Sequence, residues 1–542
     1  MDNLSTSTDQ QIRGQTTRRV GVVGLAIVGS RIFGLVREQV LAAMFGAGKL
    51  LDAFYGAFRI PNLLRDLLAE GALSTAFTTV FTQVHEKEGS ERAWRLVRLM
   101  FSLMIVFMGA ITLLGILAAP LIISLTNAGF HAVEGKWELT VALTRILFPF
   151  IFFVSIAAVV MGILNARHVF ALPASASTVF NIVSVITGVT LAYLFDPQEN
   201  WLKPHFTEKA LYGISLGVLI GGIAQLLIQL PSLWKQGFRA GWIWDLKDRH
   251  LREVLRLMLP SVISGSAVQV NVLVNGVFAS MINGGISWLN CAFRLMQFPI
   301  GVFGVAIATV TLPAVSILKA RGDMQGFSHA LIHAIRLTLF LTLPAATGLA
   351  VLAYPIIQVI YEHGRFLSND TLATSQALQA YALGLVGYSL IKVLTPCFYA
   401  LGEAKAPLRV SLWGMGINLI LNSVFFYALG WGHIGLAFST SMLALINSAQ
   451  LLVMISRRVH LFSSWGRFLC SLFFSTLMMA LTAWVAIGLW PGSDSLFEQA
   501  LRLLSVILLA TVVFFFCAFL TRMQEAKEFF SFLKRPKIAS KS

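Results

Sequence analysis

Arginines and carboxylates gather in one stretch of the chain, from Ser30 to Glu70, which lies among hydrophobic segments long enough to cross a bilayer. An ionisable side chain at membrane depth costs about 2.5–3.5 kcal/mol on insertion scales, so several of them require a protein-lined or water-filled cavity. A guanidinium group stays charged when buried, and its planar fork suits phosphate oxygens. We therefore predict an anion-binding cavity. The charged candidates are Arg31, Arg37, Glu38, Asp52, Arg59, Arg65, Asp66 and Glu70.

The spacing of the later members predicts one shared helix face. Asp52, Arg59 and Asp66 are seven residues apart, so they drift by only about 20° per step, and Glu70 follows one turn further on. From Asp52 to Glu70 the helix would rise about 27 Å, which is close to the hydrocarbon thickness of a bilayer. Pro61 is expected to bend or interrupt this helix.

The two earlier arginines fit one cavity less simply. Arg31 and Arg37 are about 120° out of phase on an ideal helix, with Gly34 between them. They converge only if the helix is broken or the cavity is wide. The alternative for the whole group is structural, namely ion pairs that hold helices together or side chains that reach the interface from helix ends.

The composition places these residues in a multi-pass membrane protein. Of 542 residues, 57% are hydrophobic and 12% are charged, far from the composition of soluble domains. The net charge of +16 sits in short loops between apolar runs, so the positive-inside rule explains it better than a nucleic-acid partner does. The four cysteines are widely spaced in apolar segments and predict neither a disulfide framework nor a metal site.

Apolar stretches of about 20 residues predict an all-α chain with about 14 transmembrane helices. An even number places both termini on one side, and the distribution of Lys and Arg predicts that this side is the cytoplasm. The expected spans are 20–45, 51–82, 95–126, 138–164, 170–195, 210–234, 252–283, 287–318, 330–361, 372–401, 408–430, 434–456, 468–490 and 499–521.

An internal repeat predicts the domain organisation. Ala57-Phe58-Arg59 recurs about 235 residues later as Ala292-Phe293-Arg294, in the second span of each half. Six spans per half make the repeats parallel, and such halves usually enclose a cavity. We expect an N-terminal lobe at 1–235, a C-terminal lobe at 236–460, and two extra helices with a basic tail at 461–542.

The second half has fewer candidates. Arg294 lies in the middle of a span and is the strongest of them. Asn418 and Asn422 are four residues apart, so they share a helix face and form a candidate ion site, although such amides more often bond between helices. There is no P-loop, no Ser/His/Asp set and no HExxH motif. We predict a carrier without catalytic residues, cofactor or metal.

Three segments resemble the MurJ (MviN) family of bacterial lipid II flippases, in the multidrug/oligosaccharidyl-lipid/polysaccharide exporter superfamily. They read SRIFGLVRE, FGAGKLLDAFYGAFRIPNLLRDLLAEGALSTAF and WLNCAFRLMQFPIGVFGVAIATVTLP. The resemblance extends from about Val20 to about Arg522. It implies 14 helices, two six-helix lobes around a V-shaped cavity, and a groove for the polyprenyl tail formed by the last two helices. It also implies a substrate, lipid II, moved from the cytoplasmic to the periplasmic leaflet of the bacterial inner membrane for peptidoglycan synthesis.

Carried over by motif, the family's arginines and polar groups fall on seven positions of this chain. These are the residues expected to meet the pyrophosphate and sugar: Arg31, Arg37, Asp52, Arg59, Arg65, Arg294 and Ser287. Glu38, Asp66 and Glu70 would be supporting charges. Asp66 stands where some relatives have a second arginine, and Glu38 where they have aspartate. Some members bind sodium through a carboxylate four residues from an asparagine, whereas this chain has amides at Asn418 and Asn422, which leaves the coupling ion, Na⁺ or H⁺, open.

Two alternatives share the sequence features. A flippase for another polyprenyl-linked glycan, such as an O-antigen unit, would need the same phosphate chemistry. A membrane scaffold for cell-wall enzymes would tolerate alanine at the cavity arginines, whereas a transporter would not. Expected partners are therefore lipid II, membrane lipids and other cell-wall synthesis proteins.

Overall fold

The computed structural model describes residues 28–67, 73–199, 204–459, 465–489 and 495–534, and every regular element in these ranges is a helix. Contacts divide the chain into two compact units, residues 1–287 and 288–542. Within the described residues, each predicted span falls on one helix or on two or three helical elements in series, with boundaries shifted by a few residues; residues 20–27 of the first span lie outside these ranges. The predicted all-α membrane architecture is confirmed.

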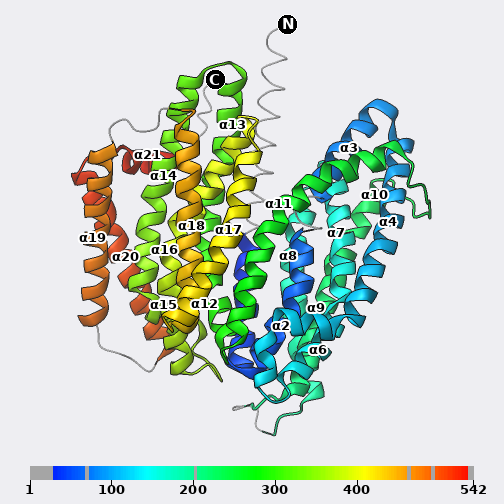
Figure 1. Ribbon diagram of the computed structural model, residues 1–542, viewed down its shortest axis with the longest axis horizontal. Helices are drawn as coiled ribbons and strands as arrows, with labels where there is room; N and C mark the ends of the chain where they lie inside the picture. Colours follow the sequence, from blue (N-terminus) through cyan, green and yellow to red (C-terminus); the bar gives the residue numbers. More distant parts are fainter. Residues whose placement is uncertain (1–27, 68–72, 200–203, 460–464, 490–494, 535–542) are drawn as a thin grey trace. The chain divides into compact units, whose positions relative to one another are not determined.

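The first unit consists of a helix at residues 28–45 and a series of longer and shorter helices (Figure 1). In order they are α2 (Lys49–Arg65), α3 (Ser74–Glu88), α4 (Ser90–Leu117), α5 (Ala119–Thr126), the 3₁₀ helix η2 (Ala128–Ala132), α6 (Lys136–Leu147), α7 (Pro149–Ala166), α8 (Ala171–Phe195), α9 (Glu208–Leu227), α10 (Leu230–Lys235) and α11 (Arg249–Ser280).

Charge distinguishes the helices that carry the candidate site. Within the described ranges, eleven helices are long and apolar enough to cross a membrane. The three remaining predicted spans coincide with the helix at 28–45, with α2 and α3 in series, and with α11. Within α11, the segment Val268–Ser280 is a shorter apolar helix. The two elements that carry Arg31, Arg37, Asp52 and Arg59 are therefore not among the eleven.

The expected interruption of α2 at Pro61 is wrong, and a bend at this position stays a prediction. The helix runs through Pro61 to Arg65 and then widens into a π-turn at residues 66–67. The predicted face from Asp52 to Asp66 therefore ends with the α-helix, since Asp66 is already its C-cap. Glu70 lies outside the described residues, so the extension of the charged face to that position stays a prediction.

Glycines bring α8 and α9 into close contact. Gly213, Gly217 and Gly221 are spaced by four along α9, the small-residue spacing that lets membrane helices approach backbone to backbone. A Cβ at Gly217 would lie 2.3 Å from the Cα of Gly188 in α8. Such a distance is impossible for any side chain, so the α8–α9 pair depends on glycine at this position.

The second unit continues with α12, which begins just before the division between the units. Its elements are α12 (Gly285–Pro299), the π-helix η3 (Ile300–Gly304), α13 (Val305–Ala320), α14 (Met324–Val351), α15 (Ala353–Tyr361), α16 (Ser368–Ala400), α17 (Lys405–Ser423), the π-helix η4 (Val424–Ala428), α18 (Gly432–Ser456), α19 (Trp465–Leu489), α20 (Leu496–Leu520) and α21 (Gln524–Lys534).

The last three helices attach to α14 and α15. Phe340 of α14, Phe468 of α19 and Phe514 of α20 belong to one buried cluster. In Figure 1, α21 follows the end of α20 and lies beside α14, which it contacts at His333 and Arg336. The Nε atom of Arg336 lies 2.7 Å from Oε1 of Glu525, whose carboxylate is almost fully buried. The predicted basic tail thus begins with a helix that an ion pair links to α14.

The two compact units defined by contacts do not coincide with the two lobes predicted from the repeat. The repeat places the helix at Arg249–Ser280 in the C-terminal lobe, whereas α11 packs against α3, α4 and η2 within the first unit. The lobe boundary at 235/236 therefore stays a prediction of the repeat alone.

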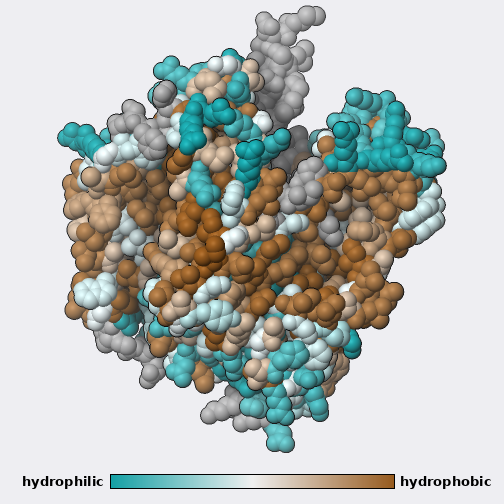
Figure 2. Space-filling view, in the orientation of Figure 1, coloured by the Kyte–Doolittle hydropathy of each residue, from teal (hydrophilic) through white to brown (hydrophobic). Residues whose placement is uncertain are grey.

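Apolar side chains cover the middle of each unit on the face shown in Figure 2, and hydrophilic residues gather toward the ends. Large apolar residues with half or more of their surface exposed are common, for example Leu117 on α4, Phe473 on α19 and Leu508 on α20. Contiguous apolar surface of this kind is typical of contact with lipid.

Candidate functional site

Asp52 is the centre of a buried polar cluster in the first unit. Its carboxylate, on α2, is fully buried and accepts hydrogen bonds at both oxygens. Gly284 N–H donates to Oδ2 at 2.7 Å, and Ser287 donates to Oδ1 from its backbone N–H at 2.9 Å and from its hydroxyl at 2.6 Å. The carboxylate thus binds the first turn of α12, where orphan N–H groups favour an anion.

Lys136 supplies the opposing charge. Its Nζ atom, at the start of α6, lies 2.7 Å from Oδ2 of Asp52 and 3.2 Å from Oδ1 of Asn283, and it stands 4.4 Å above the centre of the Phe130 ring. Lys136 and Asp52 are both 0% exposed. Sequence reasoning missed this lysine, because the only signal is a single cation at the start of an apolar span.

The Asp52 cluster changes the interpretation of two predicted substrate contacts. In this conformation Asp52 and Ser287 are fully buried and bonded to each other. A buried ion pair of this kind is stabilised by its additional hydrogen bonds, and losing one partner strands the other charge. Both residues therefore join α2 to the start of α12 here, and their contact with a substrate stays a prediction.

Arg37 lies in a second, mostly buried group. Its Nη2 atom is 2.8 Å from Oε1 of Glu38, and Tyr55 on α2 donates to Oε2 of Glu38 at 2.5 Å. The guanidinium also stands over the rings of Phe180 and Phe58, at 5.4 and 5.9 Å from their centres. The supporting acid predicted at Glu38 therefore pairs with the arginine beside it, and aromatic rings hold that arginine in place.

Arg59 packs directly against α11. A Cβ at Gly276 would lie 1.7 Å from Nη1 of Arg59, so a larger residue there would displace this half-buried guanidinium from its present position. Neither residue's pattern indicates the other, since they are more than two hundred residues apart in the chain. The glycine of α11 was not among the predicted site residues.

The remaining arginines of the first unit lie nearer the surface. Arg65 donates from Nη2 to Oδ1 of Asp66 at 2.9 Å, and both side chains are partly exposed. Arg31 is exposed on the helix at 28–45. The structure thus places Arg37, Asp52 and Arg59 in mainly buried surroundings, with Arg31, Arg65 and Asp66 at more accessible positions.

In the second unit, Arg294 is exposed on α12. Asn418 and Asn422 are fully buried on α17, and Asn422 Oδ1 accepts a hydrogen bond from the hydroxyl of Ser439 on α18. Within the described residues, no three His, Cys, Asp or Glu side chains form a group that could hold a metal ion. Amide and hydroxyl oxygens alone offer a cation no balancing charge, so the candidate ion site stays a prediction.

A further charged cluster, outside the predicted site, links α3 to the first turn of α11. Glu88 accepts from the Arg249 guanidinium and lies 3.0 Å from Nε2 of His250. Burial raises the pKa of Glu88, but the hydrogen bonds and charges of Arg249 and His250 outweigh burial and hold that pKa below its ordinary value. Asp248 caps α11 by accepting from the N–H groups of His250 and Leu251.

Comparison with known proteins identifies the family. The profile of the family described as "Lipid II flippase MurJ" matches residues 41–519. The chain belongs to this family. The probable lipid II flippase MurJ of Vibrio cholerae is 36% identical over 438 residues, covering 79% of this chain and 81% of that protein. The lipid II flippase MurJ of Burkholderia cenocepacia is 33% identical over 496 residues, covering 90% and 93%.

Solved structures agree with the MurJ assignment. A structure titled "Lipid II flippase MurJ, inward closed conformation" superimposes with a TM-score of 0.75 at 28% identity, covering 91% of this chain and 98% of that one. An inward-facing multidrug resistance MATE transporter of the MOP superfamily superimposes with a TM-score of 0.64 at 16% identity, covering 81% and 94%. The MATE likeness shows the shared fold. MurJ is a family of transporters, which confirms the predicted carrier.

Proposed function

We propose that this chain is a flippase that moves lipid II from the cytoplasmic to the periplasmic leaflet of the bacterial inner membrane. The observation that carries this proposal is the family match over residues 41–519, supported by relatives that bear the same name across most of their length. The substrate's pyrophosphate needs cationic groups at membrane depth, and the chain retains them in the family's motifs.

Charge in the first unit favours a diphosphate. Four arginines lie in the motif segments, at Arg31, Arg37, Arg59 and Arg65, and the adjacent acids Glu38 and Asp66 pair with two of them. Asp52, which the sequence counts against them, is balanced by Lys136 inside the protein. The local balance is therefore more positive than the motif segments alone suggest, and guanidinium groups bind phosphate oxygens in bidentate fashion.

We propose that Arg31 and Arg294, which are both exposed, bind the pyrophosphate, with Arg37 and Arg59 supporting it. Transport would follow alternating access, as in other carriers built from repeats. Basic residues in the loops between apolar spans favour cytoplasmic termini. The same proposal includes coupling of transport to Na⁺, to H⁺ or to the membrane potential. It also includes association with other cell-wall enzymes.

The proposal is tested with labelled lipid II in proteoliposomes and by complementation of a flippase-depleted strain. Arg31→Ala and Arg294→Ala should each reduce transport by at least about tenfold, since a lost charge-assisted hydrogen bond costs about 1.5–3 kcal/mol. Arg321→Ala is the matched control, because Arg321 is exposed at the end of α13 and lies outside the motifs.

Two results would count against the proposal, and a third would show that the assay is not specific. Full complementation by both alanine variants would favour a scaffold. A depleted strain that accumulates another polyprenyl-linked glycan rather than lipid II would favour the other flippase. Equal loss of transport in Arg321→Ala would show that the assay reports general damage to the protein.

A further inference from the structure

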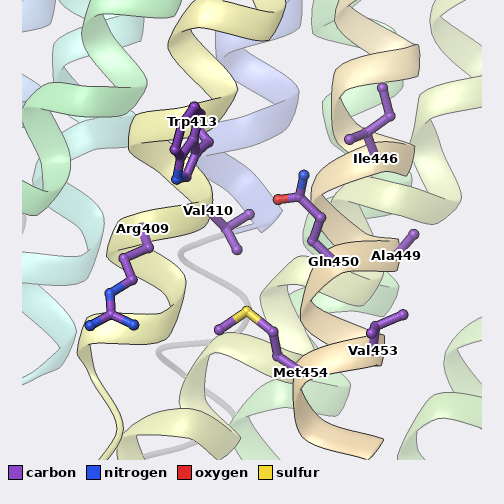
Figure 3. Close-up of a pocket in the computed structure, with 8 residues that line it drawn as sticks. All are labelled: Arg409, Val410, Trp413, Ile446, Ala449, Gln450, Val453 and Met454. Atoms are coloured by element: carbon purple, nitrogen blue, oxygen red, sulfur yellow. The ribbon is translucent and has the colours of Figure 1, made fainter.

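A groove between α17 and α18 is lined by none of the predicted site residues. Its volume is about 670 Å³, within the range of about 300–1,000 Å³ for pockets that hold small ligands. Figure 3 shows Val410 on α17 and Gln450 and Met454 on α18 pointing toward one another, whereas the side chain of Arg409 extends downward along α17. Arg409, Trp413 and Ile446 also line the groove. The walls are mainly apolar, with one guanidinium and one amide.

Arg409 is the polar feature that determines what the groove can bind. It lies on a helix apolar enough to span a membrane, and its side chain is exposed. Among the residues that the structure describes, none forms an ion pair or hydrogen bond with its guanidinium. An arginine at a span's end requires an anion or water, and an anion is the stronger partner.

Other cations stand at the same end of the groove. Lys405 precedes Arg409 by one turn on α17 and is exposed. Arg457 and Arg458 follow the last turn of α18, and Arg458 pairs with Glu403 at 3.1 Å. After that pair is counted, Lys405, Arg409 and Arg457 leave this end positive.

Trp413 continues the apolar wall away from the charged end. It lies one turn beyond Arg409 on the same face of α17, and 74% of its surface is exposed. An indole beside a cation and an apolar groove is typical of the membrane interface, where lipid headgroups meet acyl chains.

We propose that the α17–α18 groove binds an anionic phospholipid, with the phosphate on Arg409 and one acyl chain along Val410, Trp413 and Met454. This binding is separate from the transported substrate. A second copy of the chain would bury the apolar wall equally well, but it would offer no anion to Arg409, and the charge at this end favours the lipid.

The test uses Trp413 as a reporter. The protein is placed in nanodiscs that contain phosphatidylglycerol and phosphatidylcholine, with bromine on the acyl chains of one lipid at a time. The share of fluorescence quenching that disappears in Trp413→Phe reports lipid in the groove. At equal mole fractions, brominated phosphatidylglycerol should occupy the groove about fivefold more than phosphatidylcholine, the preference expected for one basic residue near the surface.

Arg409→Gln should remove that preference, whereas Arg321→Gln should retain it. Equal quenching by both lipids in the unaltered chain, or an unchanged preference in Arg409→Gln, would overturn the proposal. So would protection of Trp413 from both lipids together with cross-linking between two copies, which would identify the occupant as a second chain. Loss of the preference on adding inorganic phosphate would instead indicate a site for soluble anions.

Discussion

At the scale of single residues, the Asp52 carboxylate has more partners than any other group described above. It accepts from Lys136, Gly284 and Ser287, and none of these contacts is open to solvent. A carboxylate with this many donors is held in one position. Asp52 therefore serves as a structural link between α2, α6 and α12 rather than as a mobile substrate-binding group.

The first prediction concerns the buried contacts of Asp52. Asp52→Asn should lower stability by about 3–5 kcal/mol, because Lys136 would be left as an unpaired buried charge. The measurement is the apparent melting temperature of the purified protein in detergent, together with lipid II transport. An unchanged melting temperature would contradict the buried pair.

The double variant Asp52→Asn with Lys136→Met is the informative companion. Removing both charges should recover much of the lost stability, as expected when two buried partners are replaced together. If transport also recovers, Asp52 acts only through the structure. If stability returns while transport does not, the carboxylate has a direct part in transport.

Sequence reasoning at this scale found the charges but not their partners. The motifs pointed to Asp52, Arg59 and Ser287, and the structure brings Asp52 and Ser287 together. Lys136 and Gly276 were missed, since a single lysine or glycine in an apolar helix carries no local signal of a contact far along the chain. Such pairings arise from tertiary packing, which periodicity does not encode.

At the scale of helices, the α8–α9 contact depends on size rather than polarity. The backbones of Gly188 and Gly217 are so close that any added carbon would overlap. Membrane helices that approach in this way are held by van der Waals contact and gain little from the hydrophobic effect.

The second prediction follows from that contact. Gly217→Ala should destabilise the protein by about 1–3 kcal/mol through overpacking. Gly109→Ala, in α4, is the control, since a Cβ there meets nothing within 4 Å, and it should be neutral or stabilising by about 0.5–1 kcal/mol. Thermal unfolding of the two variants in one detergent gives the comparison, and equal effects would contradict the close approach.

A third prediction concerns the link between α3 and α11. Since the folded state holds the pKa of Glu88 below its ordinary value of 4.5, the carboxylate stabilises the fold fully above that value. Its contribution is lost as the pH falls through the lower, folded-state pKa. The melting temperature of Glu88→Gln should therefore lie below that of the parent at neutral pH, and the gap should close under acid conditions.

Glu91→Gln is the control for that experiment, since Glu91 is exposed in the first turn of the adjacent α4. Its difference from the parent should stay small at every pH. A gap for Glu88→Gln that persists well below pH 4 would show that the side chain acts through packing instead of charge.

The helices themselves were the most predictable part of the fold. Hydrophobic runs located each span, because lipid requires about 20 apolar residues whatever the tertiary structure. Breaks were harder to predict: α2 passes through Pro61 and ends only after Arg65. A helix tolerates a proline where neighbouring helices or solvent satisfy the freed carbonyl.

At the scale of the whole molecule, the internal repeat and the contacts divide the chain at different points. The repeat groups α11 with the C-terminal lobe, whereas contacts group it with residues 1–287. The repeat reflects duplication within the sequence, whereas the contacts reflect the packing in one conformation. Sequence alone therefore indicates how many lobes to expect but not which helices pack together in a given state.

The fourth prediction concerns the membrane potential. Carrying an anionic headgroup toward the positive side is favoured by about 2.3 kcal/mol per charge per 100 mV. In proteoliposomes, a potential that is negative on the side of the basic loops should therefore raise the rate of lipid II transport severalfold, and the reverse polarity should lower it. Rates that ignore both polarities would exclude the potential as a driving force.

The hydrogen-bond donors to Asp52 are synthesised at very different times. Its donors at Gly284 and Ser287 lie 232 and 235 residues further along the chain, and Lys136 lies 84 residues further along. At ribosomal speeds of about 5–20 residues per second, the final donors emerge on the order of 10–50 s after the carboxylate. Lys136 is made 84 residues after Asp52, and the first turn of α12 only after more than half of the chain has been synthesised, so the complete set of donors to Asp52 forms late in synthesis.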